Sequence, residues 1–137
     1  LTSTLSIALD DRGLAKAAER STGDEPDPTN YDAIWVRDNL WVYLGLRTDP
    51  RESENVRRLL LTLTDYFASP AQMARLRAVA ENPKRLDGPD GAMQAVHIRF
   101  DRKSPEYGDV QEAGRPQTWN HKQNDALGLF LDLFCRA

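Results

Sequence analysis

The stretch YDAIWVRDNLWVYLGLR, residues 31–47, decides how this chain is expected to fold. Its centre, WVRD at residues 35–38, places an ion-forming pair beside an indole, and an apolar run follows at once. Because that run has no polar stripe, it predicts a helix that is buried on both sides, with Trp41 in the core. Charged groups are costly to desolvate, so we expect Arg37 and Asp38 to face a polar pocket, with Asp38 as the helix N-cap.

The last stretch of the chain repeats this arrangement. The cluster WNHKQND, residues 119–125, precedes a second helix that is apolar nearly all round. Between the two, Asp49 and Pro50 begin an amphipathic helix. Its apolar stripe has helical spacing and consists of Val56, Leu59, Leu60, Leu63 and Phe67. Such alternation of buried and half-exposed helices is what concentric rings of helices require, with the polar clusters at one rim of the inner ring.

The remaining segments carry weaker signals. An Ala-rich run after Gly13 predicts a short helix, and the proline- and acid-rich residues 21–30 predict a loop. A third helix is predicted from Pro70 to about Glu81, where Asn-Pro ends it.

A short strand is predicted near residues 95–101, because apolar and polar side chains alternate there. On this strand His97 falls in the polar set and is expected to be exposed. Residues 102–118 are polar and predict a long irregular excursion, which in a helical protein is usually functional or disordered.

Composition and charge exclude several classes of function. The chain has 137 residues, 40% of them hydrophobic and 28% charged, which suits one globular domain. A net charge of −3 gives no case for nucleic acid or an anionic membrane as a partner. No apolar run approaches the ~20 residues that span a bilayer. We therefore expect a cytoplasmic protein, with Cys135 unable to form an intramolecular disulfide.

Neither a metal nor a cofactor is expected, because no set of His, Cys and carboxylate residues has metal-ligand spacing. The sequence starts at Leu1 without a methionine and stops at Ala137 within an apolar helical run. We therefore expect a segment of a longer protein, cut at both ends.

Two motifs carry a resemblance to a known family. Residues 35–38, W-x-R-D before an apolar helix and with Tyr31 ahead of them, resemble the start of an inner helix in glycoside hydrolase family 15, the glucoamylase family. Residues 119–125, W-x-H-x-Q-x-D, resemble a second inner-helix motif of that family. His121 and Ala126 depart from the hydrolases there and match the related regulatory subunit of phosphorylase kinase.

The resemblance implies a mainly all-α fold, a partial six-hairpin α/α toroid interrupted by the short strand. Residues 1–137 would be the N-terminal segment of one such domain. The parent would be an inverting α-glucosidase or glucoamylase-like hydrolase, with an α-linked glucan or maltooligosaccharide as its partner. The alternative is a non-hydrolytic glucan-binding relative of the regulatory-subunit type.

The substrate-binding residues implied by the motifs combine aromatic faces for stacking with polar groups for sugar hydroxyls. They are Trp35, Arg37, Asp38, Trp119, His121, Gln123 and Asp125. No catalytic residue is expected in this segment, because the family's two glutamates belong to later hairpins and Glu106, Asp109 and Glu112 lack a buried setting. A third interpretation stays open, a helical interaction module in which Arg37 and Asp38 are only a cap and an exposed ion pair.

Overall fold

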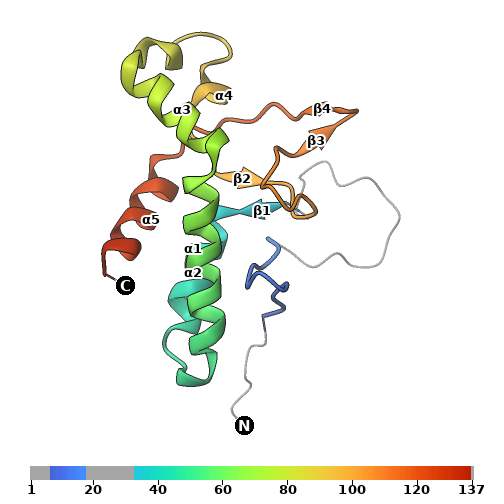
Figure 1. Ribbon diagram of the computed structural model, residues 1–137, viewed down its shortest axis with the longest axis vertical. Helices are drawn as coiled ribbons and strands as arrows, with labels where there is room; N and C mark the ends of the chain where they lie inside the picture. Colours follow the sequence, from blue (N-terminus) through green and yellow to red (C-terminus); the bar gives the residue numbers. More distant parts are fainter. Residues whose placement is uncertain (1–6, 18–32, 137) are drawn as a thin grey trace.

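The computed structural model describes residues 7–17 and 33–136 (Figure 1). Tyr31 and the predicted loop at residues 21–30 lie outside these ranges. Within them the fold is mainly helical with a few short antiparallel strands, which confirms the predicted class at that level. The helices are α1 (Val36–Leu46), η1 (Pro50–Glu52), α2 (Ser53–Ala68), α3 (Pro70–Glu81), η2 (Pro83–Leu86), α4 (Gly91–Gln94) and α5 (Asn124–Arg136). The strands are β1 (Ile34–Trp35), β2 (Arg99–Phe100), β3 (Gln111–Glu112) and β4 (Arg115–Pro116).

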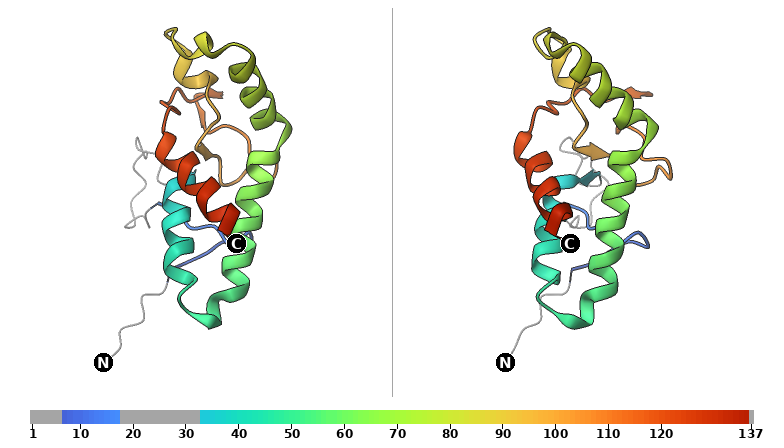
Figure 2. Two further views of the ribbon diagram at one scale, coloured as in Figure 1. Left: turned by 90° about the vertical axis from the view of Figure 1, so that its left-hand side faces the viewer. Right: turned by 60° about the vertical axis from the view of Figure 1, so that its left-hand side comes forward.

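Helices α1 and α2 form an antiparallel hairpin, and α5 packs alongside it (Figure 2). Asp49 and Pro50, which were predicted to begin the amphipathic helix, begin the short helix η1 instead. The Asp49 carboxylate accepts from the amide of Arg51 and caps η1, and α2 begins at Ser53. The stripe predicted for α2 is confirmed, with Leu59 and Leu63 fully buried. Helix α3 has its predicted bounds.

The core lies where α1, α2 and α5 meet the β1–β2 pair. Its buried members are Leu14, Ile34, Val36, Leu40, Tyr43, Leu59, Leu63, Tyr66, Ile98, Phe100, Ala126, Phe130 and Leu133. Aromatic rings join the layers, since the centroid of Tyr66 lies 4.4 Å from that of Phe100, and Phe67 lies 4.5 Å from Phe130. The core therefore draws on every predicted apolar stretch.

The prediction that Trp41 is a core residue is wrong, because its side chain is 61% exposed. Helix α1 contacts α2 and α5, and these two neighbours leave one of its faces uncovered among the described residues. Leu131 and Phe134 on α5 are exposed for the same reason. The apolar side chains of a helix are thus buried only on the faces that neighbouring elements cover.

The prediction that Asp38 caps α1 is also wrong. The helix begins at Val36, with Trp35 as its N-cap residue and no side-chain cap. The amide of Val36 instead donates to the carbonyl of Ile98 at 3.0 Å. The chain beside β2 supplies the acceptor that a capping carboxylate would otherwise provide.

Two further expectations need correction. The predicted strand at 95–101 shrinks to Arg99–Phe100, and His97 before it is buried rather than exposed. The excursion at 102–118 contains the β3–β4 hairpin, whose turn residues Ala113 and Gly114 both have positive φ, at 50° and 76°. Positive φ at both central residues is the geometry of a type I′ hairpin turn.

The predicted helix after Gly13 is absent from residues 14–17, because Asn39 holds this segment extended. The Asn39 side chain accepts from the amide of Ala15 at 2.8 Å and donates to its carbonyl at 3.0 Å. It also donates to the carbonyl of Trp35 at 2.9 Å. Gly13 has φ +79°, and a Cβ there would lie 2.9 Å from the amide nitrogen of Leu59. None of the helices in these described ranges is long and apolar enough to cross a membrane.

Replacing Asn39 with alanine is expected to destabilise the fold by about 3 kcal/mol, because the buried amide and carbonyl of Ala15 both lose their partner. Urea unfolding followed by circular dichroism measures this change. Thr48→Ala is the control, since its exposed hydroxyl bonds only to the nearby Gly45 carbonyl, and a change within about 0.5 kcal/mol is expected. Equal stability of the two variants would contradict the role given to Asn39.

Candidate functional site

The pairing of β1 with β2 brings an indole and a guanidinium together. Trp35 and Arg99 are opposite each other in the antiparallel register. Residues directly opposite in such a pair project from the same face of the strands. The guanidinium carbon of Arg99 lies 5.2 Å from the centroid of the Trp35 ring, within the range of a cation–π contact.

The segment before α5 adds a second indole. Trp119 lies with its ring centroid 4.3 Å from the guanidinium carbon of Arg99. It also meets Trp35 edge to face, with centroids 5.0 Å apart and ring planes at 82°. Gln117 accepts a hydrogen bond from Nη2 of Arg99 at 2.6 Å. We call Trp35, Arg99, Gln117 and Trp119 the tryptophan–arginine cluster.

Arg99 is a buried cation, with only 2% of its surface exposed. Burial lowers the pKa of its guanidinium to about 10, and the nearby charges of Glu112 and Asp109 oppose that shift. The side chain therefore stays charged at neutral pH. Buried charges in proteins are normally paired, and the partner that the structure gives Arg99 is a neutral amide.

Three buried polar atoms have no hydrogen-bond partner among the described residues: Nη1 of Arg99 and Nε1 of Trp119 in the cluster, and Oε1 of Gln123 in the segment before α5. Two are donors and the third is an acceptor. Leaving such an atom unsatisfied costs about 1–3 kcal/mol, so each needs an explanation. A ligand or water that accepts hydrogen bonds would satisfy the two nitrogens of the cluster.

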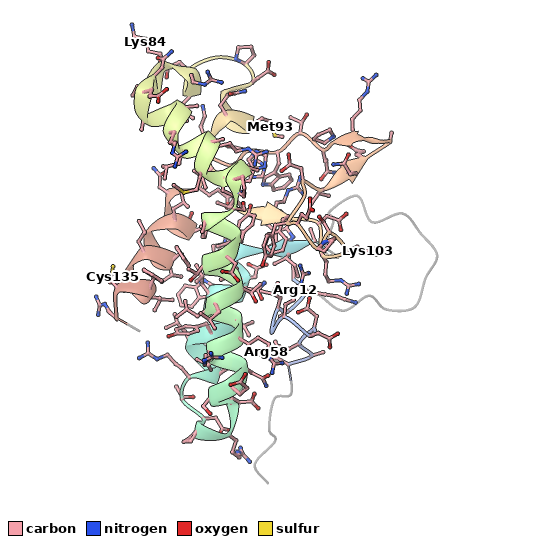
Figure 3. All side chains as sticks on the ribbon, viewed as in Figure 1. Arg12, Arg58, Lys84, Met93, Lys103 and Cys135 are labelled. Carbon is pink, nitrogen blue, oxygen red and sulfur yellow. The ribbon has the colours of Figure 1, made fainter. Side chains whose placement is uncertain are left out.

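A second polar network lies on the α4 side of the cluster, where Met93 is labelled above β2 in Figure 3. Nδ1 of His97 lies 2.7 Å from the carboxylate of Asp109, and Nε2 lies 3.1 Å from the carbonyl of Met93. Arg75 donates to the same carboxylate at 2.9 Å. The hydrogen bond from His97 is the main reason that the pKa of Asp109 is lowered.

His121 stacks on His97, with ring centroids 3.7 Å apart. Its Nδ1 accepts from the amide of Ile98 at 3.3 Å. Burial, followed by the charges of His97 and Arg99, lowers the pKa of His121 to about 3. A ring predicted as a substrate-binding residue is therefore neutral and buried, with one nitrogen occupied by the backbone beside β2.

The two sequence motifs meet through an ion pair as well as through their indoles. Arg37 lies 3.3 Å from the carboxylate of Asp125, and their side chains are 47% and 58% exposed. An exposed pair of this kind contributes at most about 1 kcal/mol. Asp38 is partly buried, and this burial raises its pKa against the opposing charge of Arg37.

The structure thus brings four of the predicted site residues into two direct contacts. Trp35 and Trp119 touch, Arg37 reaches Asp125, and Gln123 presents an unpaired oxygen. Their role in binding stays a prediction. Sequence reasoning missed residues whose importance depends on pairing: Arg99, Gln117, His97 and Asp109. A charged residue in the polar set of an otherwise apolar strand was the available signal for Arg99.

Two other features of the described residues bear on function. An apolar pocket of about 170 Å³ lies between α2, α3 and α5. It is lined by Phe67, Gln72, Leu76, Val96, Leu127, Phe130 and Leu131. In residues 7–17 and 33–136, no group of three or more His, Cys, Asp or Glu side chains is placed to hold a metal ion.

Comparison with known proteins gives one informative match. The chain is 57% identical over 109 residues to a protein of Escherichia coli (strain K12) named "Uncharacterized lipoprotein YgeQ". The match covers 80% of this chain but 41% of the relative, so the chain spans less than half of that protein's length. No family model matches the sequence, and no solved structure matches it.

This match overturns the functional predictions made from the two motifs. The resemblance to glycoside hydrolase family 15 and the phosphorylase kinase regulatory subunit is wrong, because the 57% identical relative is an uncharacterized lipoprotein. With it fall the predicted glucoamylase-like hydrolase, its glucan-binding regulatory alternative and a place in carbohydrate metabolism. A few fixed residues before an apolar helix recur too easily to identify a family.

The predicted cytoplasmic location is wrong on the same evidence, because the relative is named a lipoprotein. The location rested on composition and on a lone cysteine. Neither of these features bears on whether a protein carries a lipid.

The low pKa of His121 predicts that stability falls as the pH is lowered. The unfolded chain takes up a proton on His121 near pH 6.5, whereas the native chain resists it down to about pH 3. The free energy of unfolding should therefore drop by about 2 kcal/mol between pH 7 and pH 5. Urea unfolding at the two pH values measures this drop.

The control variant is His121→Asn, whose side-chain oxygen can replace Nδ1 as acceptor for Ile98 but does not titrate. It should lose most of the drop. The lowered pKa of Asp109 does not interfere, because its contribution is lost only below the ordinary value of 3.8. A variant as pH-sensitive as the wild type would contradict the assignment to His121.

Proposed function

We propose that this chain is part of a lipoprotein, as its relative is named, and that the tryptophan–arginine cluster binds a small organic carboxylate. The observation that carries the proposal is the buried charge of Arg99. Within residues 7–17 and 33–136, neither its Nη1 nor Nε1 of Trp119, whose ring it contacts, has a hydrogen-bond partner. A carboxylate oxygen accepts from both kinds of donor. It also supplies the negative charge that a buried guanidinium requires.

The surroundings of Arg99 favour an added anion over a rearranged internal pair. Of the two carboxylates whose charges act on Arg99, Glu112 lies exposed on β3, and Asp109 already accepts from Arg75 and lies 2.7 Å from His97. Asp125 is paired with Arg37 at the start of α5. A hydrogen bond to a charged group contributes about 1.5–3 kcal/mol, so a carboxylate ligand would gain measurable affinity from Arg99.

Several sequence predictions stay proposals beside this one. A six-hairpin α/α toroid is supported by the α1–α2 hairpin and by the packing of α5 against α1. That residues 1–137 are the N-terminal segment of one larger domain agrees with a match to 41% of a longer relative. An α-linked glucan or maltooligosaccharide as partner, and the absence of nucleic acid and membrane partners, also stay predictions.

A binding screen tests the proposed function. Acetate, propionate, benzoate and maltotriose are titrated into the ¹⁵N-labelled protein, and amide and indole N–H shifts are followed by NMR. We expect the carboxylates to shift the Trp119 indole resonance and maltotriose to leave it unchanged. If none of the three carboxylates shifts the resonances of the cluster, the proposal fails.

Two variants should weaken binding of these carboxylates. Arg99→Met keeps the length of the side chain but removes the charge, and Trp119→Phe removes one donor; losses of at least tenfold and of about threefold are expected. Arg115→Met is the matched control, because Arg115 lies exposed on β4. Equal affinity in Arg99→Met and Arg115→Met would mean that the carboxylate binds elsewhere.

A further inference from the structure

We infer that the apolar pocket between α2, α3 and α5 binds a small, uncharged aromatic compound that carries one hydrogen-bond acceptor, such as an aryl ketone. This pocket is separate from the tryptophan–arginine cluster, because none of the four cluster residues lines it. The inference therefore stands or falls independently of the proposed carboxylate site.

The pocket has the size of a single ring. Its volume is about 170 Å³, and six of its seven lining residues are apolar. An apolar cavity of roughly 150 Å³ stays dry and takes up benzene, whereas drug-sized ligands occupy pockets of about 300–1,000 Å³. The volume and the lining therefore favour a ligand of about one ring over a larger molecule or a group of waters.

Aromatic side chains form part of the pocket wall. Phe67 of α2 and Phe130 of α5 lie with ring centroids 4.5 Å apart and ring planes tilted by 44°. Phe130 is 6% exposed, whereas Leu76 and Leu131 are 49% and 57% exposed, so the mouth of the pocket lies beside these leucines. A flat ring that enters past them meets phenylalanine rings, and aromatic pairs gain attraction beyond the burial of their area.

Gln72 is the polar residue of the lining and is only 2% exposed. Its Oε1 accepts from the amide of His97 at 2.9 Å, which fixes the orientation of the side-chain amide. In residues 7–17 and 33–136 its Nε2 has no hydrogen-bond acceptor, and it is not among the unpaired atoms that are shut off from solvent. We therefore place this donor at the pocket wall, where a ligand with one acceptor satisfies it.

The lining also selects against charge. None of the residues that line the pocket in the described part of the chain is ionisable. A charged ligand would lose its hydration there without gaining a counter-ion, which is costly in apolar surroundings. Benzoate, a proposed ligand of the tryptophan–arginine cluster, should therefore be excluded from this pocket although its ring is of the same size.

Matched ligands test the inference by NMR titration of the 137-residue protein with ¹³C-labelled leucine and valine methyl groups. Acetophenone has the ring and the acceptor, 2-hexanone has the acceptor on an aliphatic chain, and benzoate has the ring with a charge. We expect acetophenone to shift the methyl groups of Leu127 and Val96. It should bind there about fivefold more tightly than 2-hexanone and at least about tenfold more tightly than benzoate.

A change at the mouth of the pocket locates the binding. Leu76→Gln should weaken the binding of acetophenone at least about threefold, because it puts a polar group where the ring enters. Leu61→Gln is the matched control: Leu61 is 47% exposed on α2 and is not among the residues that line the pocket. Equal losses in the two variants would mean that acetophenone binds elsewhere, and would overturn the inference.

A second pair of ligands tests the role of Gln72. Ethylbenzene has a methylene group where acetophenone has its carbonyl, so the ratio of their two dissociation constants isolates the hydrogen bond. Gln72→Met should shift this ratio against acetophenone at least about threefold, because methionine has no donor. If Gln72→Met does not fold, Gln72→Glu is the second variant, since its carboxylate keeps an acceptor for His97 but lacks the donor.

The remaining outcomes are equally decisive. An unchanged ratio in the Gln72 variant overturns the selection for an acceptor, and 2-hexanone that binds as tightly as acetophenone overturns the selection for a ring. Lining methyl groups that ignore acetophenone but shift when the free protein is diluted would show that a second copy of the chain occupies the pocket. That result overturns the inference as a whole, and the carboxylate site is unaffected by any of these outcomes.

Discussion

The short antiparallel pairing of β1 with β2 is the contact on which the rest of this structure depends. It is two residues long on each side, yet it sets Trp35 opposite Arg99 and lets the backbone beside β2 receive the first amide of α1. Tyr66 of α2 extends the same junction, since its buried hydroxyl donates to the carbonyls of His97 and Arg99. The junction therefore fixes the start of α1, the position of α2 and the location of the candidate site.

Two polar groupings lie near β2, and in the described part of the chain the guanidinium of one of them, Arg99, has no ion-pair partner. Asp109 serves both Arg75 and His97, and the stacked ring of His121 stays neutral beside them. Arg99 instead makes cation–π contacts with two indoles and a hydrogen bond to one side-chain amide. Cation–π contacts offset part of the cost of desolvating a guanidinium, but they do not neutralise its charge. The carboxylate of Asp109 thus bonds directly to the first grouping, whereas Arg99 is stabilised only by the more distant charges of Glu112 and Asp109.

Local signals in the sequence predicted the helices well, because their determinants are close together in the chain. Pro70 and the stripe on Leu59 and Leu63 act within one element, and the structure follows them. The exposure of Trp41 and the burial of His97 depend on which elements pack nearby, and no local period reports that. The same holds for Arg99, whose importance comes from its partner across the strand pair.

Two pairs of the predicted site residues lie in contact, for a reason that does not involve a sugar site. Trp35 meets Trp119 and Arg37 meets Asp125 because apolar helices that begin with polar clusters align at one end of the bundle. That physical argument holds without the family resemblance that accompanied it. The unpaired nitrogens of Arg99 and Trp119 could not be inferred from the sequence, because they depend on how distant segments pack together.

The exposed position of Trp41 has a practical consequence for spectroscopy. Its indole is 61% exposed, whereas Trp35 and Trp119 are partly buried against the guanidinium of Arg99. Intrinsic emission of the protein therefore mixes one solvent-facing fluorophore with two shielded ones. A chain carrying phenylalanine in place of Trp41 would make the remaining emission a direct optical reporter of the region around Arg99.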